Sequence, residues 1–236
     1  MIPAHEMRRL EAVATPERPL AELVKLRSSG QPLQYLEGTA AFGPLTLAVD
    51  HRVLIPRPET EYLAALLVRR HSHPRLVVDL CTGSGAVALF LKSVWPQSRV
   101  VATDFSADAL AVARQNGHQL RLDVEWYSGD LFGALPGELR AKADLLVANP
   151  PYVSVSEWDL LPVDVRHEPR SALVAGPIGT EIIDRILAGV GDWLVPGGEA
   201  WIEIGETQAL ELRERHRVEI YQDQYGKDRF ARMKHD

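Results

Sequence analysis

The tetrapeptide Asn149-Pro150-Pro151-Tyr152 carries the groups best suited to chemistry in this chain. It follows an apolar, strand-like run over residues 145–148 and stops that run with two prolines. In an open α/β sheet, ligands bind at the carboxyl ends of the strands, so the motif stands where chemistry would be done. Asn149 and the Pro150 carbonyl can accept both hydrogens of a planar NH2 group while Tyr152 stacks on its face. This pattern indicates methylation of an amide or exocyclic amine nitrogen, and its alternative is an ordinary strand and turn.

A second group of residues has the spacing of a cofactor site. The segment Asp79-Leu80-Cys81-Thr82-Gly83-Ser84-Gly85 lies between an apolar strand and an apolar helix. Its glycines allow a tight turn and a close approach of the backbone to a ligand, although such turns also occur for packing alone. The candidate cofactor-binding residues are Asp79, Cys81, Thr82, Gly83, Ser84, Gly85, Asp104, Asp130, Leu131 and Asn149.

Acidic residues near the ends of successive predicted strands indicate the type of cofactor. Asp104 is placed to accept hydrogen bonds from both hydroxyls of a ribose. Asp130 can accept from an adenine amino group, with Leu131 and Phe132 lining the base. Asp79 would repel a phosphate but can pair with the amino group of a methionine moiety, and the turn lacks the third glycine of the dinucleotide fingerprint. S-adenosylmethionine therefore fits better than NAD, although any one aspartate alone is more often a turn residue.

Composition narrows the classes of partner and the compartment. A formal charge of -6 argues against broad binding to a phosphate backbone, so no direct nucleic-acid partner is expected. No apolar run approaches the ~20 residues of a membrane span, so no membrane partner is expected either. Cys81 is the only cysteine, and no Cys/His spacing suggests a metal site. These features are typical of a cytoplasmic α/β protein without a structural metal.

The elements that would position these residues alternate between strand and helix from residue 76 onward, which is typical of a parallel, doubly wound sheet. A closing antiparallel hairpin is expected near the C-terminus. The predicted strands are 76–80, 100–104, 124–127, 145–148 and 200–204, and the hairpin arms are 218–221 and 229–233. The predicted helices are 86–94, 107–117, 181–194 and 207–215.

The N-terminal part is expected to be built differently. Residues 1–30 are predicted to form a short helical segment in which Thr15 caps a helix. Residues 31–56 are predicted to form a β-hairpin linker, with the hairpin over 35–49 and a turn at Gly43-Pro44.

Taken together, the motifs closely resemble the protein-(glutamine-N5) methyltransferases that modify the Gly-Gly-Gln loop of bacterial peptide-chain release factors. The Asn-Pro-Pro-Tyr motif is shared with adenine-N6 methyltransferases of nucleic acids, whereas Pro-Arg-Pro-Glu-Thr-Glu is much more specific to the glutamine enzymes. The family usually has an N-terminal domain of several helices, so the N-terminal region here is shortened by comparison. The matching segments are Pro32-Leu33-Gln34-Tyr35, Leu54-Ile55-Pro56-Arg57-Pro58-Glu59-Thr60-Glu61, Asp79 to Gly85, Asn149 to Tyr152 and Asp164-Val165-Arg166-His167-Glu168-Pro169.

The resemblance implies a class I S-adenosylmethionine-dependent methyltransferase fold over residues 57–236. This α/β fold is a Rossmann-like, seven-stranded and mostly parallel sheet with a C-terminal antiparallel hairpin. It also implies S-adenosyl-L-methionine as the cofactor and N5-methylation of the release-factor glutamine, in translation termination, by a monomer. The implied catalytic residues are Asn149, Pro150, Pro151 and Tyr152.

Two other functions remain open at this point. An adenine-N6 methyltransferase acting on DNA or RNA would use the same tetrapeptide on a flipped base. A non-catalytic S-adenosylmethionine-binding scaffold would keep the fold without turnover.

Several further residues receive weaker assignments. Glu59 and Glu61 are expected to cap a helix or close over the cofactor. Arg166, His167 and Glu168 are candidates for the substrate rim, Cys81 for packing where many relatives have glycine, and Trp158 and Trp193 for packing.

Overall fold

The computed structural model describes residues 2–236, whose centre is a seven-stranded sheet with the order β10-β11-β9-β6-β3-β4-β5. Neighbouring strands pair in parallel except at β11, which is antiparallel to both β9 and β10. The mostly parallel sheet with a C-terminal antiparallel hairpin is therefore confirmed. The strands are β3 (Leu76–Leu80), β4 (Arg99–Asp104), β5 (Glu125–Ser128), β6 (Ala143–Ala148), β9 (Leu194–Glu203), β10 (Glu219–Gln222) and β11 (Asp228–Lys234).

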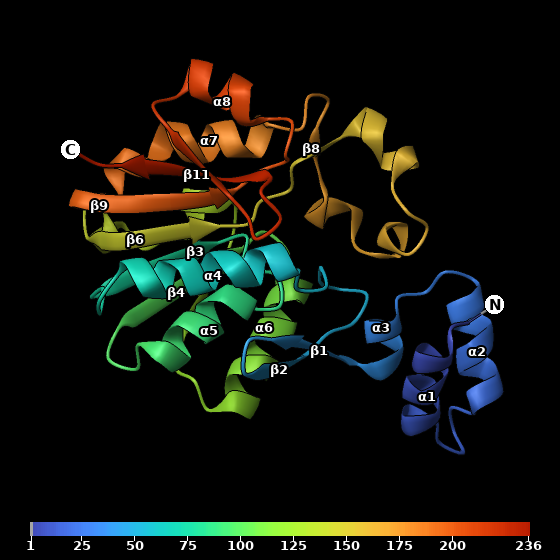
Figure 1. Cartoon of the computed structure of the whole chain (residues 1–236). Helices are drawn as coiled ribbons and strands as arrows, with labels where there is room; N and C mark the ends of the chain where they lie inside the picture. Colours follow the sequence, from blue (N-terminus) through green and yellow to red (C-terminus); the bar gives the residue numbers. More distant parts are fainter. Residues whose placement is uncertain (1) are drawn as a thin grey trace.

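Helices cover both faces of this sheet, so its central strands are buried on both sides, as parallel strands require. Every residue of β3 is buried. Figure 1 shows α4, α5 and α6 on one side of the sheet and α7 and α8 on the other. The helices are α4 (Pro58–Arg70), α5 (Ala86–Val94), α6 (Ala107–Leu120), α7 (Glu181–Gly189) and α8 (Ala209–Arg215).

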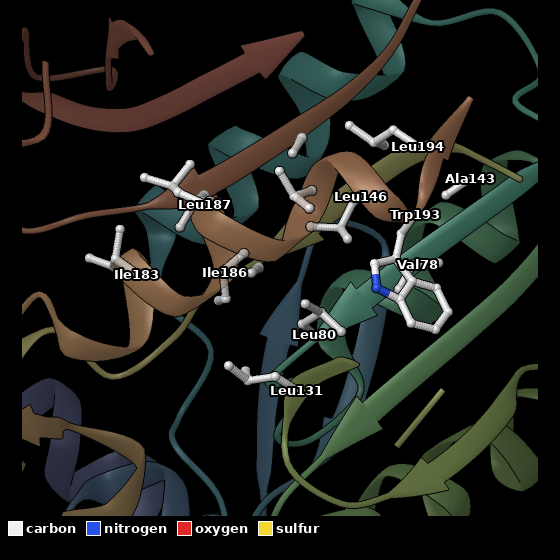
Figure 2. Close-up of a cluster of buried hydrophobic side chains, with 14 of the residues drawn as sticks. Val78, Leu80, Leu131, Ala143, Leu146, Ile183, Ile186, Leu187, Trp193 and Leu194 are labelled. Atoms are coloured by element: carbon white, nitrogen blue, oxygen red, sulfur yellow. The ribbon is translucent and has the colours of Figure 1, made fainter. Parts of the chain in front are cut away.

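A large apolar cluster holds α7 against the sheet. Figure 2 shows Ile183, Ile186 and Leu187 of α7 gathered with Leu80 of β3 and Leu146 of β6. All of these side chains are at most 4% exposed. The cluster reaches Leu131 near the carboxyl end of the sheet, so the packing that stabilises the fold also supports the loops at that edge.

The predicted helix over residues 181–194 is wrong in its second half. Regular helix ends at Gly189, a short 3-10 turn covers Val190–Asp192, and β9 already begins at Leu194. Gly189 and Gly191 weaken helix continuation. Trp193 turns into the core, where it is 3% exposed.

The N-terminal part contains α1 (Ala4–Val13), α2 (Leu20–Ser28) and α3 (Leu33–Glu37), which share a separate apolar cluster. The expected cap at Thr15 is wrong, because Thr15 closes a turn with Arg18 and α2 begins only after Pro19. The cluster is formed by Leu10, Leu23, Leu33 and Leu36.

The expected hairpin is shorter than predicted. Its arms are β1 (Thr39–Phe42) and β2 (Leu45–Ala48), and the turn at Gly43-Pro44 is confirmed. A Cβ on Gly43 would lie 2.7 Å from the Phe90 ring, and its φ is +54°, so the position requires glycine. Residues 33–37 form helix α3 instead of the first arm. Asn116 of α6 bonds the Ala48 backbone through both Nδ2 and Oδ1, which fixes the hairpin to the domain.

The connection between β6 and α7 is long and mostly irregular. It contains the short parallel pair β7 (Val153–Ser154) and β8 (Val174–Gly176), together with 3-10 turns over Val155–Leu160, Val165–His167 and Arg170–Ala172. Figure 1 shows this connection extending from the sheet on the side of the N-terminal helices. Its position brings the 164–169 motif to the loop that precedes α4, through the Arg57–Glu168 contact.

Candidate functional site

A cavity of about 350 Å³ opens at the carboxyl ends of β3, β4 and β6. This volume is within the usual range of small-molecule and cofactor sites. It brings together nearly all of the predicted cofactor-binding residues; Gly85 is the exception among them. Those in the wall are Asp79, Cys81, Thr82, Gly83, Ser84, Asp104, Asp130, Leu131 and Asn149.

The glycine-rich turn has alternating left-handed residues, with φ of +59° at Cys81, +56° at Gly83 and +82° at Gly85. A Cβ on Gly83 would meet nothing within 4 Å, whereas one on Gly85 would lie 2.9 Å from Trp126. Gly83 therefore leaves space at the cavity, and Gly85 serves packing at the start of α5. The left-handed backbone at Cys81 explains why glycine suits this position.

The surroundings of Cys81 do not activate its thiol as a nucleophile. Burial raises its pKa, and the neighbouring carboxylates of Asp104, Asp79 and Asp130 raise it further. The thiol therefore stays protonated at neutral pH. Its expected role in packing agrees with its contact with the α7 apolar cluster.

The Asp79 carboxyl group is buried, and the residue is 1% exposed. Its Oδ2 accepts hydrogen bonds from Thr82 Oγ1 at 2.6 Å and from the Ala88 amide at 3.2 Å. Burial raises the pKa of Asp79 to about 7, despite these hydrogen bonds. Because both bonds go to Oδ2, the carboxylate retains Oδ1 for a cationic group in the cavity.

Asp104 links two backbone segments at the cavity wall. Its Oδ2 accepts from the Gly83 amide and its Oδ1 from the Ser106 amide, each at 2.8 Å. Burial raises the pKa of this carboxyl, although the backbone hydrogen bonds lower it. The adjacent Phe105 also lines the cavity and is 78% exposed. The sequence interpretation missed Phe105; a large apolar residue directly after a strand-end carboxylate was the available signal.

Asp130 lies at the cavity rim, where its Oδ2 accepts from Arg185 Nη2 at 2.6 Å. Leu131 adopts φ +47° and lies in the cavity wall. The prediction for Phe132 is wrong, because its ring stacks on Trp193 at 5.7 Å between centroids. That contact places Phe132 in the packing of the α7 side, so Leu131 alone of the pair lines the cavity.

In the predicted catalytic tetrapeptide, Asn149 and Pro151 line the cavity, while Pro150 and Tyr152 do not belong to its wall. Asn149 Nδ2 donates to Thr60 Oγ1 at 3.0 Å. Oδ1 is therefore the side-chain atom of Asn149 that is left to accept a hydrogen bond from a ligand. The Tyr152 hydroxyl donates to Glu203 Oε1 at 3.3 Å.

Thr60 and Glu203 are partners of the tetrapeptide that the sequence interpretation missed. Thr60 lines the cavity and donates to Glu203 Oε2 at 2.7 Å. Glu203 is 1% exposed at the end of β9, whose Ile202 pairs with Ala148 of β6. Burial raises the pKa of Glu203 to about 7. A carboxylate inside the apolar run Ala200-Trp201-Ile202-Glu203-Ile204 was the signal for such a partner.

Other candidates are less directly involved. Glu59 and Glu61 occupy the first turn of α4, in agreement with the expected place at the start of a helix, and they do not line the cavity. Their closure over the cofactor stays a prediction. Glu168 is buried and forms an ion pair with the half-buried Arg57. His167 Nε2 lies 3.3 Å from the Ser29 carbonyl, toward the N-terminal helices.

Of the two tryptophans that were predicted to serve packing, Trp193 is buried and Trp158 is half-buried. Trp193 is 3% exposed, and the Arg170 guanidinium lies 5.6 Å from the centre of the Trp158 ring. The packing prediction for Trp193 is therefore confirmed.

The cavity fits S-adenosylmethionine in its chemistry. Three carboxylates, from Asp79, Asp104 and Asp130, lie along a wall that would face a ligand with a positive sulfonium and a positive amino group. Thr103 Oγ1 also lines the cavity and is buried without a hydrogen-bond partner among residues 2–236. A bound polar ligand can satisfy that hydroxyl.

Residues 2–236 contain neither a cluster of metal ligands nor a helix suited to a membrane. No three His, Cys, Asp or Glu side chains in the described part of the chain come together as a metal-binding group. Within residues 2–236, no helix combines the length and the apolar character needed to cross a membrane.

Similarity in three dimensions agrees with this geometry. The chain superposes on a methyltransferase from Pyrococcus furiosus with a TM-score of 0.61 and 18% identity, covering 82% of this chain and 90% of that one. The 16S rRNA N2 G1207 methyltransferase of T. thermophilus, solved with AdoMet and guanosine, gives a TM-score of 0.57 at 18% identity, covering 84% of this chain and 50% of that one. The fold is therefore that of the class I S-adenosylmethionine-dependent methyltransferases.

Sequence similarity narrows the family. The model described as methyltransferase small domain matches residues 58–162. The release factor glutamine methyltransferase of Deinococcus radiodurans is 39% identical over 219 residues, covering 89% of this chain and 77% of the relative. That of Moorella thermoacetica is 38% identical over 219 residues, covering 88% of this chain and 76% of the relative. With this degree of identity over most of both proteins, and with a cavity that fits the methyl donor, the chain belongs to the release factor glutamine methyltransferase family.

Proposed function

We propose that this protein transfers a methyl group from S-adenosylmethionine to the N5 amide of the glutamine in the Gly-Gly-Gln motif of peptide-chain release factors. The observation that carries the proposal is the orientation of the Asn149 side-chain amide. Its Nδ2 is committed to Thr60, so its Oδ1 is left to accept a hydrogen from a ligand at the cavity. A primary amide has the two hydrogens that such an arrangement recognises.

An amide nitrogen is a weak nucleophile because its lone pair is delocalised into the carbonyl. When bound, S-adenosylmethionine supplies an electrophilic methyl group on a sulfonium. Asn149 Oδ1 and the Pro150 carbonyl would accept the two amide hydrogens and hold the nitrogen in line with that methyl group. The same oxygens would favour the positive character that develops on the nitrogen as the nitrogen–carbon bond forms and the carbon–sulfur bond breaks, which leaves S-adenosylhomocysteine. One amide hydrogen would then leave as a proton to water. Tyr152 lies outside the cavity wall, so it is proposed to contact the glutamine side chain beside the cavity.

The remaining site residues would bind the cofactor. Asp79 is proposed to pair with its amino group, Asp104 with the ribose hydroxyls and Asp130 with the adenine amino group. Leu131 and the exposed ring of Phe105 would contact the adenine. The backbone of the turn from Cys81 to Gly85 would follow the methionine moiety.

We also propose how the chain is divided into segments and where the protein acts. We infer a helical segment, a hairpin linker and a catalytic domain from residue 57, with the first boundary near Gly38 because Leu33 and Leu36 pack with α1 and α2. The protein would act as a monomer in the cytoplasm, without direct contacts to nucleic acid or membrane. A formal charge of -6 supports the absence of a nucleic-acid partner.

The test is transfer of labelled methyl groups to purified release factor, with a Gln→Ala variant of its Gly-Gly-Gln motif as the matched control. The proposal expects label on the native release factor and background on the variant. Equal labelling of both proteins would exclude the glutamine as the acceptor. Labelling of an adenine-containing oligonucleotide instead would support the adenine-N6 alternative, and cofactor binding without any transfer would support a scaffold.

A further inference from the structure

A chain of hydrogen bonds connects Asn149 to the core of the protein. Asn149 Nδ2 donates to Thr60 Oγ1 at 3.0 Å, and Thr60 Oγ1 donates to Glu203 Oε2 at 2.7 Å. Thr60 is 4% exposed and Glu203 1% exposed, so bulk water does not compete for these atoms. These hydrogen bonds join α4, the residue directly after β6, and β9, so they depend on the tertiary fold.

The direction of each of these hydrogen bonds follows from the number of hydrogens that the side chains can donate. A threonine hydroxyl has one hydrogen, and an ionised carboxylate can only accept. Once the Thr60 hydrogen goes to Glu203, the Thr60 oxygen can only accept from its other neighbour. The Asn149 amide must then present Nδ2 to Thr60, because its Oδ1 would face the hydroxyl lone pairs.

We propose that Thr60 and Glu203 are positioning residues that hold the Asn149 side chain with its oxygen, and not its NH2 group, available to the reacting amide. This inference rests on the proposed function for its kinetic consequence. It assigns Glu203 no contact with substrate or cofactor; its action on Asn149 passes through Thr60.

With a neutral residue at position 203, Thr60 no longer determines which side-chain atom of Asn149 faces it. A protonated Glu203 can donate to Thr60, whose hydrogen then turns toward Asn149 and pairs with Oδ1. The Asn149 NH2 would then face the NH2 group of the glutamine, donor against donor. Turnover therefore requires the ionised form of Glu203.

The groups around Glu203 determine when it ionises. Burial raises its pKa to about 7, although hydrogen bonds from Thr60 and Tyr152 and the charge of Arg229 on β11 lower it. Glu59 on α4 adds a like charge that raises it. Ionisation of Glu203 therefore falls within the range where an assay is practical.

The first test measures kcat at saturating cofactor and release factor at pH 8. Glu203→Gln and Thr60→Val should each lower kcat by about tenfold or more, the equivalent of about one hydrogen bond to the reacting group. Thr60→Ser keeps the hydroxyl and should stay within about threefold. Glu199→Gln is the matched control on the same strand, because Glu199 pairs with Arg232 outside the cavity, and its kcat should not change.

The pH profile adds a readout that a purely structural role would not change. In the wild-type protein, kcat at pH 6 should be about a tenth of its value at pH 8, as expected for a required base with a pKa near 7. In Thr60→Val the connection is absent, so the two values should agree within about twofold. A wild-type kcat that is the same at both values of pH would overturn the proposal.

A third measurement needs no substrate, so it tests the positioning role of Thr60 and Glu203 even if the protein does not methylate release factor. The side-chain NH2 signal of Asn149 in nitrogen-15 NMR can be assigned by its loss in Asn149→Asp. At pH 8 its hydrogen exchange should be at least about tenfold faster in Thr60→Val and in Glu203→Gln than in the wild-type protein. Equal exchange in all three folded proteins would overturn the positioning role, whereas wild-type protein that methylates no release factor would overturn only the proposed function.

Discussion

Arg57 and Glu168 form an ion pair, with 2.5 Å between Arg57 Nη2 and Glu168 Oε1, that joins the entry to α4 with the long connection after β6. Glu168 Oε2 also accepts from the Ile55 amide at 2.9 Å. Glu168 is 4% exposed. Two motifs that lie far apart in the sequence are thus held by one buried carboxylate, next to the cavity residues Pro56 and Pro169.

Replacing this carboxylate should destabilise the fold. Glu168→Ala leaves Arg57 and the Ile55 amide without their acceptor, so we expect a loss of about 3 kcal/mol in the free energy of unfolding. Urea denaturation followed by circular dichroism measures it. Asp192→Ala, which breaks the exposed pair with Arg140, is the control and should cost no more than about 0.5 kcal/mol. Similar losses in both variants would contradict the importance of the buried pair.

Cofactor affinity should depend on pH through Asp79. Burial raises the pKa of Asp79 to about 7, so the carboxyl is mainly protonated at pH 6 and ionised at pH 8. The positive amino group of the cofactor should bind the ionised form, which makes the Kd about tenfold weaker at pH 6 than at pH 8. Isothermal titration calorimetry at the two values of pH measures the difference.

The matched control for this pH dependence is Asp79→Asn, which should bind more weakly at pH 8 and show little difference between the two values of pH. The sign for stability is opposite to that for binding. Because the folded-state pKa of Asp79 lies above its ordinary value in an unfolded chain, its contribution to stability is complete below that ordinary value and is lost as the pH rises through about 7. A wild-type Kd that does not change with pH would refute the pairing with Asp79.

Phe105 should contribute to cofactor binding without contributing to stability. Its ring lines the cavity and is 78% exposed. Phe105→Ala should weaken cofactor binding by about tenfold, in line with the energies of aromatic stacking, and leave the melting temperature unchanged. Leu210→Ala removes another exposed apolar side chain, 69% exposed and outside the cavity, and should change neither quantity. Unchanged affinity in Phe105→Ala would remove this residue from the site.

The strands and helices of the sheet could be predicted because their signal is local. Apolar β-branched runs alternate with helical patterns, and the predicted bounds of β3 and α5 agree with the structure residue for residue. Helix α3 could not be predicted in this way, since it is held by Leu33 and Leu36 packing on the N-terminal helices. The Tyr35 hydroxyl also bonds the Val53 carbonyl, a contact that local periodicity does not report.

In the candidate site, too, the residues with a local sequence signal could be predicted and those placed by long-range contacts could not. The turn from Asp79 to Ser84 could be predicted from the sequence, as could Asp104 and Asn149, because these residues lie at the end of a predicted strand or directly after one. Thr60 and Glu203 were not, because their pairing joins residues 143 positions apart through the tertiary fold. Phe132 was assigned to the base by its nearness to Asp130, but the ring instead stacks on Trp193.

The central claim is tested most directly by mass spectrometry of the release-factor peptide that carries Gly-Gly-Gln, after incubation with S-adenosylmethionine and either the wild-type protein or Asn149→Ala. The account predicts one added methyl group on the glutamine side-chain nitrogen with the wild-type protein. With Asn149→Ala it predicts an unmodified peptide, although the cofactor Kd stays within about tenfold. Methylated glutamine at a near-normal rate in the variant, or no methylation by the wild-type protein, would contradict the account.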